Sequence, residues 1–308
     1  MTDKPLNILQ VGSGFPGWGG TELHLVNLAQ QLAQRGHYVT VAARPGKFVE
    51  EEARKRNLRT LPFTVNRQWD FKESQEMYRL MRAEKFDIVH VHWSTDYVVA
   101  PVTARRSGVP VVVMSRHSPY PLKSALGRYF YDRVLFDRVI ALSDSVRKTL
   151  VDQGLRPERV TTIHHGTDVD AFRETTRTPE EIRAEWRIPP KAFVVGMVGR
   201  IAEEKGWRTF LQAIANLTSK RTVKLYASTW DRSEDADDIY AVLVGEGPEE
   251  KQAREMVREL GIGGRVVFAG FRADVNNAMN ALDVHVLAST WAEPCAAVIQ
   301  QAMALGKP

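Results

Sequence analysis

Two cations follow a predicted strand in the second half of the chain, and their spacing suits a phosphate-binding site. The apolar run Phe193–Val198 is followed by Arg200, and Lys205 comes five residues after Arg200. Arginine can hold phosphate oxygens through two parallel hydrogen bonds, and lysine adds a point charge. Together they could stabilise a departing nucleoside diphosphate without a metal ion. The competing interpretation is two surface cations at a strand end, where Lys and Arg are common.

A glycine-rich loop follows the first predicted strand. It covers residues 12–21 and includes Gly19 and Gly20, where missing side chains let backbone amides approach a phosphate or a sugar. Gly12, Gly14 and Gly17 also match the spacing of the dinucleotide-binding fingerprint. In that fingerprint a helix begins directly after the glycines, whereas here Trp18-Gly19-Gly20 separate the glycines from the predicted helix. The second strand ends in Ala42-Ala43-Arg44 without an acidic ribose ligand. This argues against an NAD-dependent oxidoreductase and leaves NADP as a weak alternative.

A carboxylate lies close to the end of the sequence. Glu293 and Pro294 precede an apolar stretch, residues 295–306, that is predicted to be helical. A carboxylate in such a turn can accept hydrogen bonds from sugar hydroxyls. The competing interpretation is an acid in the first helical turn, where the helix dipole favours it by at most about 1 kcal/mol.

Alternating strands and helices must position these residues. The first predicted helix places Leu25, Leu28, Ala29 and Leu32 at helical spacing and stops at Gly36. Short β-rich runs alternate with such helices, which predicts βαβ units and parallel sheets. The predicted strands are residues 8–11, 38–42, 88–92, 109–114, 139–142 and 160–163, and then 193–198, 240–244, 266–269 and 284–287.

The strand–helix series restarts after a polar stretch that contains Pro179, Pro189 and Pro190. We therefore predict an N-terminal domain over residues 1–175 and a C-terminal domain over residues 176–308. A polar insertion at residues 219–238 is interpreted as a surface loop, to which no function is assigned.

The composition is typical of a globular protein, with 44% hydrophobic and 26% charged residues. The sequence has no apolar run of the roughly 18 residues that span a bilayer, and its first residues lack the order of a signal peptide. We therefore expect a cytoplasmic protein. The single cysteine, Cys295, excludes an internal disulfide and a cysteine-cluster metal site.

Positive charge is concentrated in the first half of the chain. Residues 1–177 carry 26 Lys and Arg against 19 Asp and Glu, and residues 178–308 carry 16 against 18. A basic half indicates an anionic partner, a membrane surface or a solvated face. No nucleic-acid partner is expected, because the sequence shows no recognition module or basic stripe. Residues 119–137 mix basic and aromatic side chains, which predicts either peripheral contact with an anionic membrane or a core-facing helix with a basic rim.

Four short motifs together resemble glycosyltransferase family 4, also called group 1. Each motif is weak alone, but they occur in the order of that family and cover nearly the whole chain. They are Gly19-Gly20-Thr21-Glu22, Arg200 with Lys205-Gly206, Val244-Gly245-Glu246-Gly247-Pro248, and Glu293-Pro294 with the helix at residues 301–306.

The resemblance implies an α/β protein of the GT-B architecture, in which two Rossmann-like domains face each other across a cleft. It implies an acceptor-side N-terminal domain and a C-terminal domain that binds the nucleotide-sugar donor. The implied reaction moves a hexose-type sugar, with retention of anomeric configuration, to a glycan, lipid-linked or small-molecule acceptor, as in cell-surface polysaccharide synthesis. No metal or other cofactor is expected.

The same resemblance assigns roles to particular positions. Arg200 and Lys205 match the pair that holds the donor diphosphate, and Glu293 matches the acid that binds hydroxyls of the transferred sugar. Gly19 and Gly20 match a loop that approaches the donor from the other domain.

His117 follows the predicted strand 109–114, where members of the family have a histidine near the reacting sugar. The competing candidates are His164, His165, and the pair His90 and His92. That pair alternates along one strand, as in a metallohydrolase, but no carboxylate or cysteine cluster accompanies it.

The sequence departs from the family pattern in three places. The family's second glutamate is Gln301 here, which still hydrogen-bonds a ribose hydroxyl but carries no negative charge. Cys295 and Ala296 replace an aromatic residue and a glycine, and Cys295 is interpreted as a packed residue and not a nucleophile. The sequence stops at Pro308, so we expect a truncated second domain. The alternatives to an active transferase are a non-catalytic member that binds nucleotide-sugar and a nucleotide-sugar epimerase.

Overall fold

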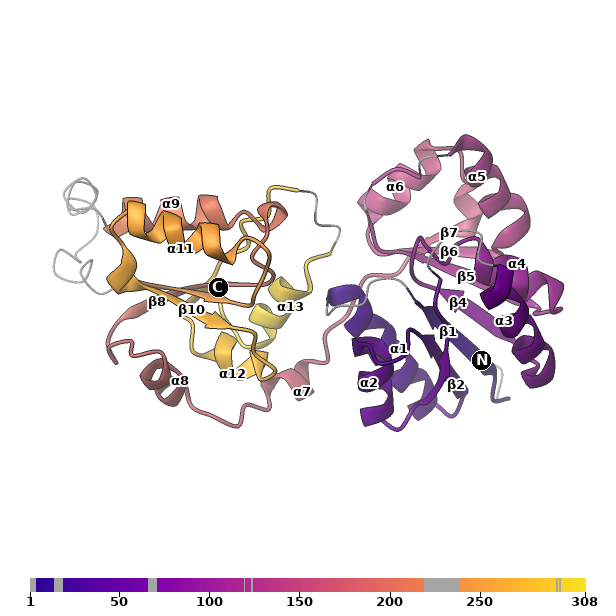
Figure 1. Cartoon of the computed structure of the whole chain (residues 1–308), viewed down its shortest axis with the longest axis horizontal. Coiled ribbons are helices and arrows are strands. Elements are labelled where there is room, and N and C mark those ends of the chain that lie inside the picture. The colour runs from indigo at the N-terminus through magenta and orange to yellow at the C-terminus, as the bar shows by residue number, and fades with distance from the viewer. Residues whose placement is uncertain are drawn as a thin grey trace. The chain divides into compact units, whose positions relative to one another are not determined.

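The computed structural model describes residues 4–13, 19–65, 71–118, 120–122, 124–218, 239–291, 293 and 295–308. Contacts divide the chain into Met1–His165 and Gly166–Pro308, here called unit 1 and unit 2 (Figure 1). The division lies earlier than the one predicted between residues 175 and 176. Helix α7 (Val169–Arg173) belongs to unit 2, because Phe172 packs on its core and Arg173 Nε donates to the Ala304 carbonyl at 2.7 Å.

Unit 1 is built on a parallel sheet whose described strands lie in the order β3-β2-β1-β4-β5-β6-β7. Strand order reverses beside β1, and in such sheets ligands bind beyond the carboxyl ends at that point. The strands are β1 (Asn7–Gly12), β2 (Tyr38–Ala43), β3 (Arg59–Pro62), β4 (Ile88–Val91), β5 (Val111–Arg116), β6 (Arg138–Ala141) and β7 (Val160–Thr162).

Helices cover both faces of this sheet, which explains why its central strands are almost uniformly apolar. One core contains residues of α1 (Gly20–Gln34) and α2 (Phe48–Lys55) packed on β2. The core on the other face contains residues of α3 (Phe71–Glu84), α4 (Val99–Arg106) and α6 (Asp144–Asp152) (Figure 1). Between β5 and β6 lie α5 (Ala125–Phe130) and the π-helix Tyr131–Leu135, and the 3-10 helix Pro157–Arg159 precedes β7.

Strand β3 was not predicted. It is four residues long, pairs with β2 alone at the edge of the sheet, and has no buried residue. An edge strand needs little hydrophobic patterning, so its sequence, Arg-Thr-Leu-Pro, gives no strand signal. The other predicted strands are confirmed, β8 with its predicted bounds and the rest with shifted ends; β5 begins two residues late, and the last strand ends at His285.

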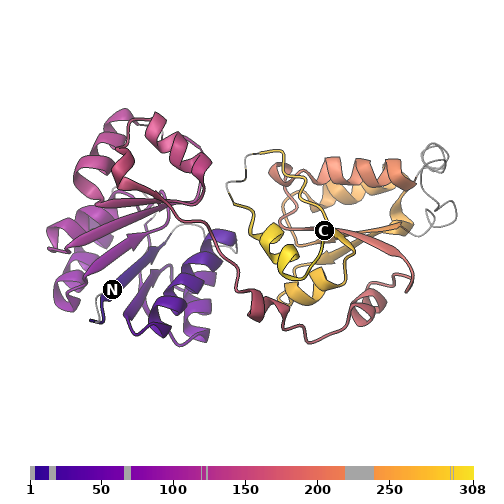
Figure 2. The same cartoon turned by 180° about the vertical axis from the view of Figure 1, so that it is seen from behind.

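Unit 2 has a parallel sheet in the described order β10-β9-β8-β11, formed by β8 (Phe193–Val198), β9 (Ile239–Val244), β10 (Val266–Gly270) and β11 (Val284–His285). Side chains alternate between two cores. Val194 and Val198 face α8 (Pro179–Glu185), α12 (Val275–Asn280) and α13 (Ala297–Ala304). Val195 and Met197 face α9 (Trp207–Thr218) and α11 (Glu250–Glu259), and Figure 2 shows these layers from behind. Residues 219–238, the predicted surface loop, lie outside the described residues.

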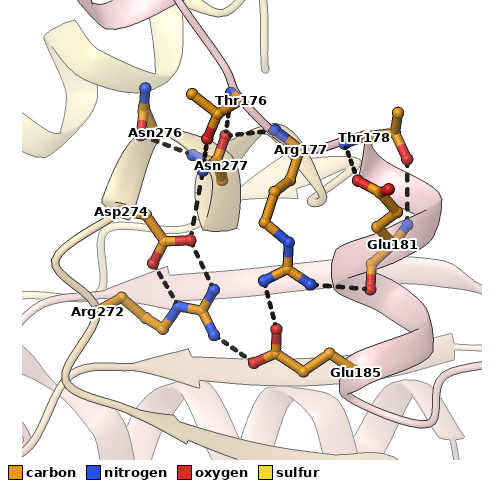
Figure 3. A network of polar contacts seen from close by, with 9 residues as sticks. All are labelled: Thr176, Arg177, Thr178, Glu181, Glu185, Arg272, Asp274, Asn276 and Asn277. Carbon is orange, nitrogen blue, oxygen red and sulfur yellow. Dashed lines mark hydrogen bonds and ion pairs between the residues drawn. The ribbon is translucent and has the colours of Figure 1, made fainter.

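A polar network fixes the start of unit 2 to its sheet (Figure 3). Asn277 Oδ1 accepts from the backbone N–H of Thr176 at 2.9 Å. The Arg272 guanidinium, 12% exposed, donates to both Asp274 oxygens at 2.8 and 2.7 Å and also pairs with Glu185 on α8. These bonds tie the segment between α7 and α8 to the β10–α12 connection.

In the described part of the chain, no helix combines the length and apolar character that a bilayer crossing requires.

Candidate functional site

The carboxyl ends of β8 and β9 carry the predicted cations of unit 2. After β8 the chain turns at Gly199, passes Arg200 and enters the 3-10 helix Glu203–Lys205. A Cβ on Gly245, at the end of β9, would lie 2.1 Å from the carbonyl oxygen of Gly199. Glycine at this position therefore lets the two strand-end turns pack backbone against backbone.

Gly206 ends the 3-10 helix in a left-handed conformation, with φ of +70°, and a Cβ there would meet the Ala288 carbonyl oxygen at 1.8 Å. Gly261 has nearly the same φ, +67°, with nothing within 4 Å. We expect Gly261→Ala to cost roughly 1–2 kcal/mol through backbone strain. Gly206→Ala should cost roughly 1–3 kcal/mol more, because the methyl group forces the backbone apart. Urea unfolding of both variants measures the difference, and equal losses would contradict the close approach.

Lys205 and Glu293 form an ion pair at this edge, although 88 residues separate them. Ser289 Oγ donates to the same Glu293 oxygen at 2.9 Å. The Lys205 and Glu293 side chains are 30% and 25% exposed, so solvent and solutes reach both. The structure thus brings together two residues to which the sequence assigned separate roles.

Arg200 pairs with Glu204, and the two side chains are 52% and 21% exposed. Partial burial opposes ionisation of Glu204, but its own backbone N–H and the Arg200 guanidinium hold its pKa below the usual range. Both cations of the site are therefore matched by carboxylates on accessible side chains. Such pairs exchange readily for a more highly charged anion, because exposed ion pairs contribute little stability.

Helix α13 begins at Ala297, and its first turn contains no acidic residue. The interpretation of Glu293 as a first-turn acid is therefore wrong. Among the described residues no side chain caps the helix at Ala296, and the backbone N–H of Ile299 donates to the Ala296 carbonyl oxygen at 3.1 Å. Gln301 lies on the second turn and is half-buried, and Pro294 lies outside the described residues.

Five imidazoles gather near the carboxyl edge of the unit 1 sheet, and we call them the histidine cluster: His24, His90, His92, His117 and His165. His24 stacks on His165 with ring centroids 3.9 Å apart, and His117 lies 5.5 Å from His24 and 5.4 Å from His165. His92 Nδ1 and His117 Nε2 are 3.2 Å apart, and His90 Nε2 lies 2.8 Å from Ser115 Oγ. The predicted site histidine and three of its competitors thus lie together, whereas His164 is exposed.

Burial lowers every pKa in the histidine cluster. The pKa of His24 falls to about 3, those of His90 and His165 fall to about 4, and those of His92 and His117 lie well below the usual range. The rings are therefore neutral near pH 7 and offer one donor and one acceptor nitrogen each. Among the described residues, no group of three or more His, Cys, Asp or Glu side chains has the arrangement of a metal site.

Two carboxyls near the glycine loop, Glu22 and Asp96, are buried, which the sequence did not predict. Burial raises the pKa of Glu22, in the first turn of α1, to about 7, and that of Asp96 to about 6. Ser13, which directly follows β1, donates two hydrogen bonds to the Asp96 carboxyl group, one from its hydroxyl and one from its backbone N–H at 2.9 Å. A Cβ on Gly19 would lie 2.7 Å from Glu22 Oε2, so a larger residue at this cap would require the Glu22 carboxylate to move. Gly20 is exposed, and residues 14–18 lie outside the described residues.

Two Rossmann-like units, each with polar side chains at the carboxyl ends of its parallel strands, define the GT-B class of α/β proteins. Residues 18–171 match the family model described as Glycosyltransferase Family 4, and residues 178–308 match the model described as Glycosyl transferases group 1. The chain belongs to this family. It is a nucleotide-sugar-dependent glycosyltransferase, and the predicted family and fold class are confirmed.

Named relatives share about a quarter of its sequence. The lipopolysaccharide core biosynthesis glycosyltransferase LpsE of Rhizobium meliloti is 27% identical over 295 residues, which cover 94% of this chain and 74% of LpsE. The UDP-Gal:alpha-D-GlcNAc-diphosphoundecaprenol alpha-1,3-galactosyltransferase of Escherichia coli is 25% identical over 78% of this chain and 61% of its own length. The structure of Anabaena HepE in complex with UDP-glucose shares the fold, with a TM-score of 0.79, 22% identity and coverage of 98% of this chain and 79% of HepE.

Proposed function

We propose that unit 2 binds a nucleoside-diphosphate sugar and that the protein transfers the hexose-type sugar with retention of anomeric configuration. The observation that carries this proposal is the Lys205–Glu293 pair beside Arg200 at the carboxyl end of β8. A cation and a hydroxyl-binding carboxylate side by side match the two chemically different parts of such a donor.

The exchange of charges on donor binding supports these assignments. A diphosphate carries more negative charge than either carboxylate, so it draws Lys205 from Glu293 and Arg200 from Glu204. The freed Glu293 carboxylate, still held by Ser289, accepts hydrogen bonds from sugar hydroxyls. In the transition state both cations stabilise the departing diphosphate, which is the charge that a divalent metal neutralises in other transferases.

The remaining assignments are extensions of the same proposal. The uncapped first turn of α13 suits a phosphate oxygen, and Gln301 on the following turn suits a ribose hydroxyl. In unit 1 we assign Gly19, Gly20 and His117 to substrate binding. LpsE is named for lipopolysaccharide core biosynthesis and the Escherichia coli relative for a lipid-linked substrate, which supports a glycan or lipid-linked acceptor.

Product analysis tests the reaction. UDP-glucose, UDP-galactose and GDP-mannose are incubated with a core oligosaccharide, with a polyprenyl-diphosphate sugar, or without acceptor, in EDTA and in magnesium. Early proton NMR spectra should show an acceptor glycoside with the anomeric configuration of the donor, formed equally well in EDTA. An inverted glycoside would overturn retention. Epimerised donor without acceptor would identify an epimerase, and binding without turnover would identify a non-catalytic member.

We also propose that unit 1 contacts anionic membranes through an apolar surface on and beside α5. Within residues 119–137, Leu135 and Phe136 are buried in the core and Tyr131 packs against it, as a core-facing segment requires, whereas no residue of α5 is buried. Leu126, Tyr129 and Phe130, at 68%, 60% and 44% exposed, share one face of α5, and Val134 in the following π-helix is 49% exposed. Arg133 follows in the same segment; its side chain is 49% exposed and pairs with Asp132 at 3.2 Å. The first half of the chain is the more basic one, which complements anionic lipid.

Vesicle flotation tests this surface. The wild-type chain should float with phosphatidylglycerol-containing vesicles and much less with phosphatidylcholine alone, and salt should weaken binding. Tyr129→Ser with Phe130→Ser should abolish flotation, because each removes a large exposed apolar side chain. Leu217→Ser, at a 44% exposed position of unit 2, is the matched control and should float normally. Normal flotation of the double variant would exclude this surface.

A further inference from the structure

Three side chains on neighbouring strands of unit 1 form a hydrogen-bonded chain that ends at His117. Gln10 lies within β1 and is fully buried, His92 directly follows β4, and His117 directly follows β5. The Gln10 Oε1 oxygen lies 2.7 Å from His92 Nε2, and His92 Nδ1 lies 3.2 Å from His117 Nε2. We call Gln10, His92 and His117 the relay. Because β1, β4 and β5 are neighbours in the sheet, the pairing of the strands places these three side chains next to one another.

The direction of the hydrogen bonds follows from the first acceptor. An amide oxygen only accepts, so His92 Nε2 carries the proton that it donates to Gln10. A neutral imidazole has one N–H, which leaves His92 Nδ1 as an acceptor. His117 must then donate from Nε2, and its own Nδ1 is left without a proton.

Both rings are held in the neutral form that this reasoning requires. Burial lowers the pKa of His92 and of His117 well below the usual range. The other imidazoles of the histidine cluster act in the same direction on both rings, and the Arg116 guanidinium does so on His117. A second proton on either ring is therefore disfavoured.

His117 Nδ1 is buried and has no hydrogen-bond partner among the residues that the structure describes. A buried acceptor without a donor is unfavourable, so this atom needs a partner that brings an O–H or N–H group. A phosphate or carboxylate oxygen brings only another acceptor and is repelled.

We propose that Gln10 and His92 are positioning residues that lock His117 in the tautomer with Nδ1 free, so that His117 selects a hydroxyl of the substrate. That the hydroxyl belongs to a sugar rests on the proposed function, whereas the tautomer does not. Neither Gln10 nor His92 needs to touch the substrate.

Nitrogen-15 NMR of the full chain labelled at histidine tests the tautomer without any activity assay. Signals that disappear in His117→Gln and His92→Gln assign the two rings. At neutral pH, Nε2 of each ring should give the signal of a protonated nitrogen and Nδ1 that of an unprotonated one. The opposite pattern, which would follow if the Gln10 amide were turned over, or a doubly protonated ring would overturn the proposal.

Gln10→Leu separates positioning from simple packing. It keeps a side chain of similar size but removes the acceptor, so both tautomers of His117 should appear while the signals of His285 in unit 2 stay unchanged. A single unaltered His117 tautomer in this variant would show that Gln10 does not set it. If the wild-type tautomer is as expected but no sugar is transferred, the proposed function fails and the relay stands.

Discussion

Replacing Lys205 with alanine is expected to lower the rate of sugar transfer by roughly a hundred- to a thousandfold, the usual loss when one donor to a developing anion is removed. Lys205 lies at the carboxyl end of β8 and is 30% exposed, so a donor can reach its ammonium group. Its removal also leaves Glu293 without its partner cation. Arg200→Ala should produce a loss of similar size, because the two cations act on the same leaving group.

Arg254→Ala is a matched control for Arg200→Ala. Arg254 and Glu250 form an i,i+4 ion pair with side chains 54% and 29% exposed, close to the 52% and 21% of Arg200 and Glu204. Arg254 lies on α11, where its guanidinium also stacks over Phe268. Steady-state rates should therefore be near wild type for Arg254→Ala. Near-normal rates for Lys205→Ala and Arg200→Ala would remove the assigned leaving-group site.

Unit 1 is expected to unfold in mild acid while unit 2 stays folded. The folded pKa of His24 is about 3, those of His90 and His165 are about 4, and those of His92 and His117 lie well below the ordinary value of 6.5. The native state therefore binds fewer protons than the unfolded state between pH 6.5 and about 4. Its contribution is complete above pH 6.5 and is lost as the pH falls toward about 4. Each net proton changes the free energy of unfolding by about 1.4 kcal/mol per pH unit.

Two carboxyls of unit 1 oppose this loss. The pKa values of Glu22 and Asp96 are raised to about 7 and about 6, so protonation of these groups favours the folded state as the pH falls through those values. Five imidazoles outnumber two carboxyls, so the net effect of acid is destabilisation by several kcal/mol, comparable to the stability of a whole domain. Unit 2 has one buried histidine of this kind, His285, with a pKa of about 4.

Hydrogen exchange measured by mass spectrometry at a series of pH values separates the two units. Peptides of unit 1 should lose protection between pH 6.5 and about 4, before those of unit 2. His24→Phe should reduce the slope of the free energy of unfolding of unit 1 against pH by the equivalent of about one proton. Phenylalanine keeps a stacked ring at this position but does not titrate. Equal protection of both units down to pH 4 would show that the imidazoles are not neutral in the folded state.

The fold was largely predictable because its strands are buried on both faces. Continuous apolar runs marked β1, β2 and β4 clearly, whereas β3 at the edge of the sheet carried no such signal. That Lys205 and Glu293 lie at the same edge of the sheet could be predicted, because both follow strands of one parallel sheet and the carboxyl ends of such strands meet at one edge. Their direct ion pair could not, because it depends on side-chain positions that spacing does not give.

The histidine cluster could be predicted only in part from the sequence. His117 was a candidate, and the alternation of His90 and His92 suggested strand packing or a metal. His24 on α1 and His165 after β7 carry no local signal, and their stacking depends on tertiary structure, because β4, β5 and β6 lie between β1 and β7 in the sheet. Glu22 was visible within a family motif, but its burial was not.

Thermal unfolding of the full chain with UDP, GDP or ADP tests the donor site of unit 2 most directly. A nucleotide at a hundred times its dissociation constant adds about 2.7 kcal/mol to stability. We predict that one of the three raises the transition temperature of the wild-type chain and of Arg254→Ala, and that the shift disappears in Arg200→Ala and Lys205→Ala. An equal shift in all four proteins, or none in the wild type, would contradict the assignment of Arg200 and Lys205 to the donor diphosphate.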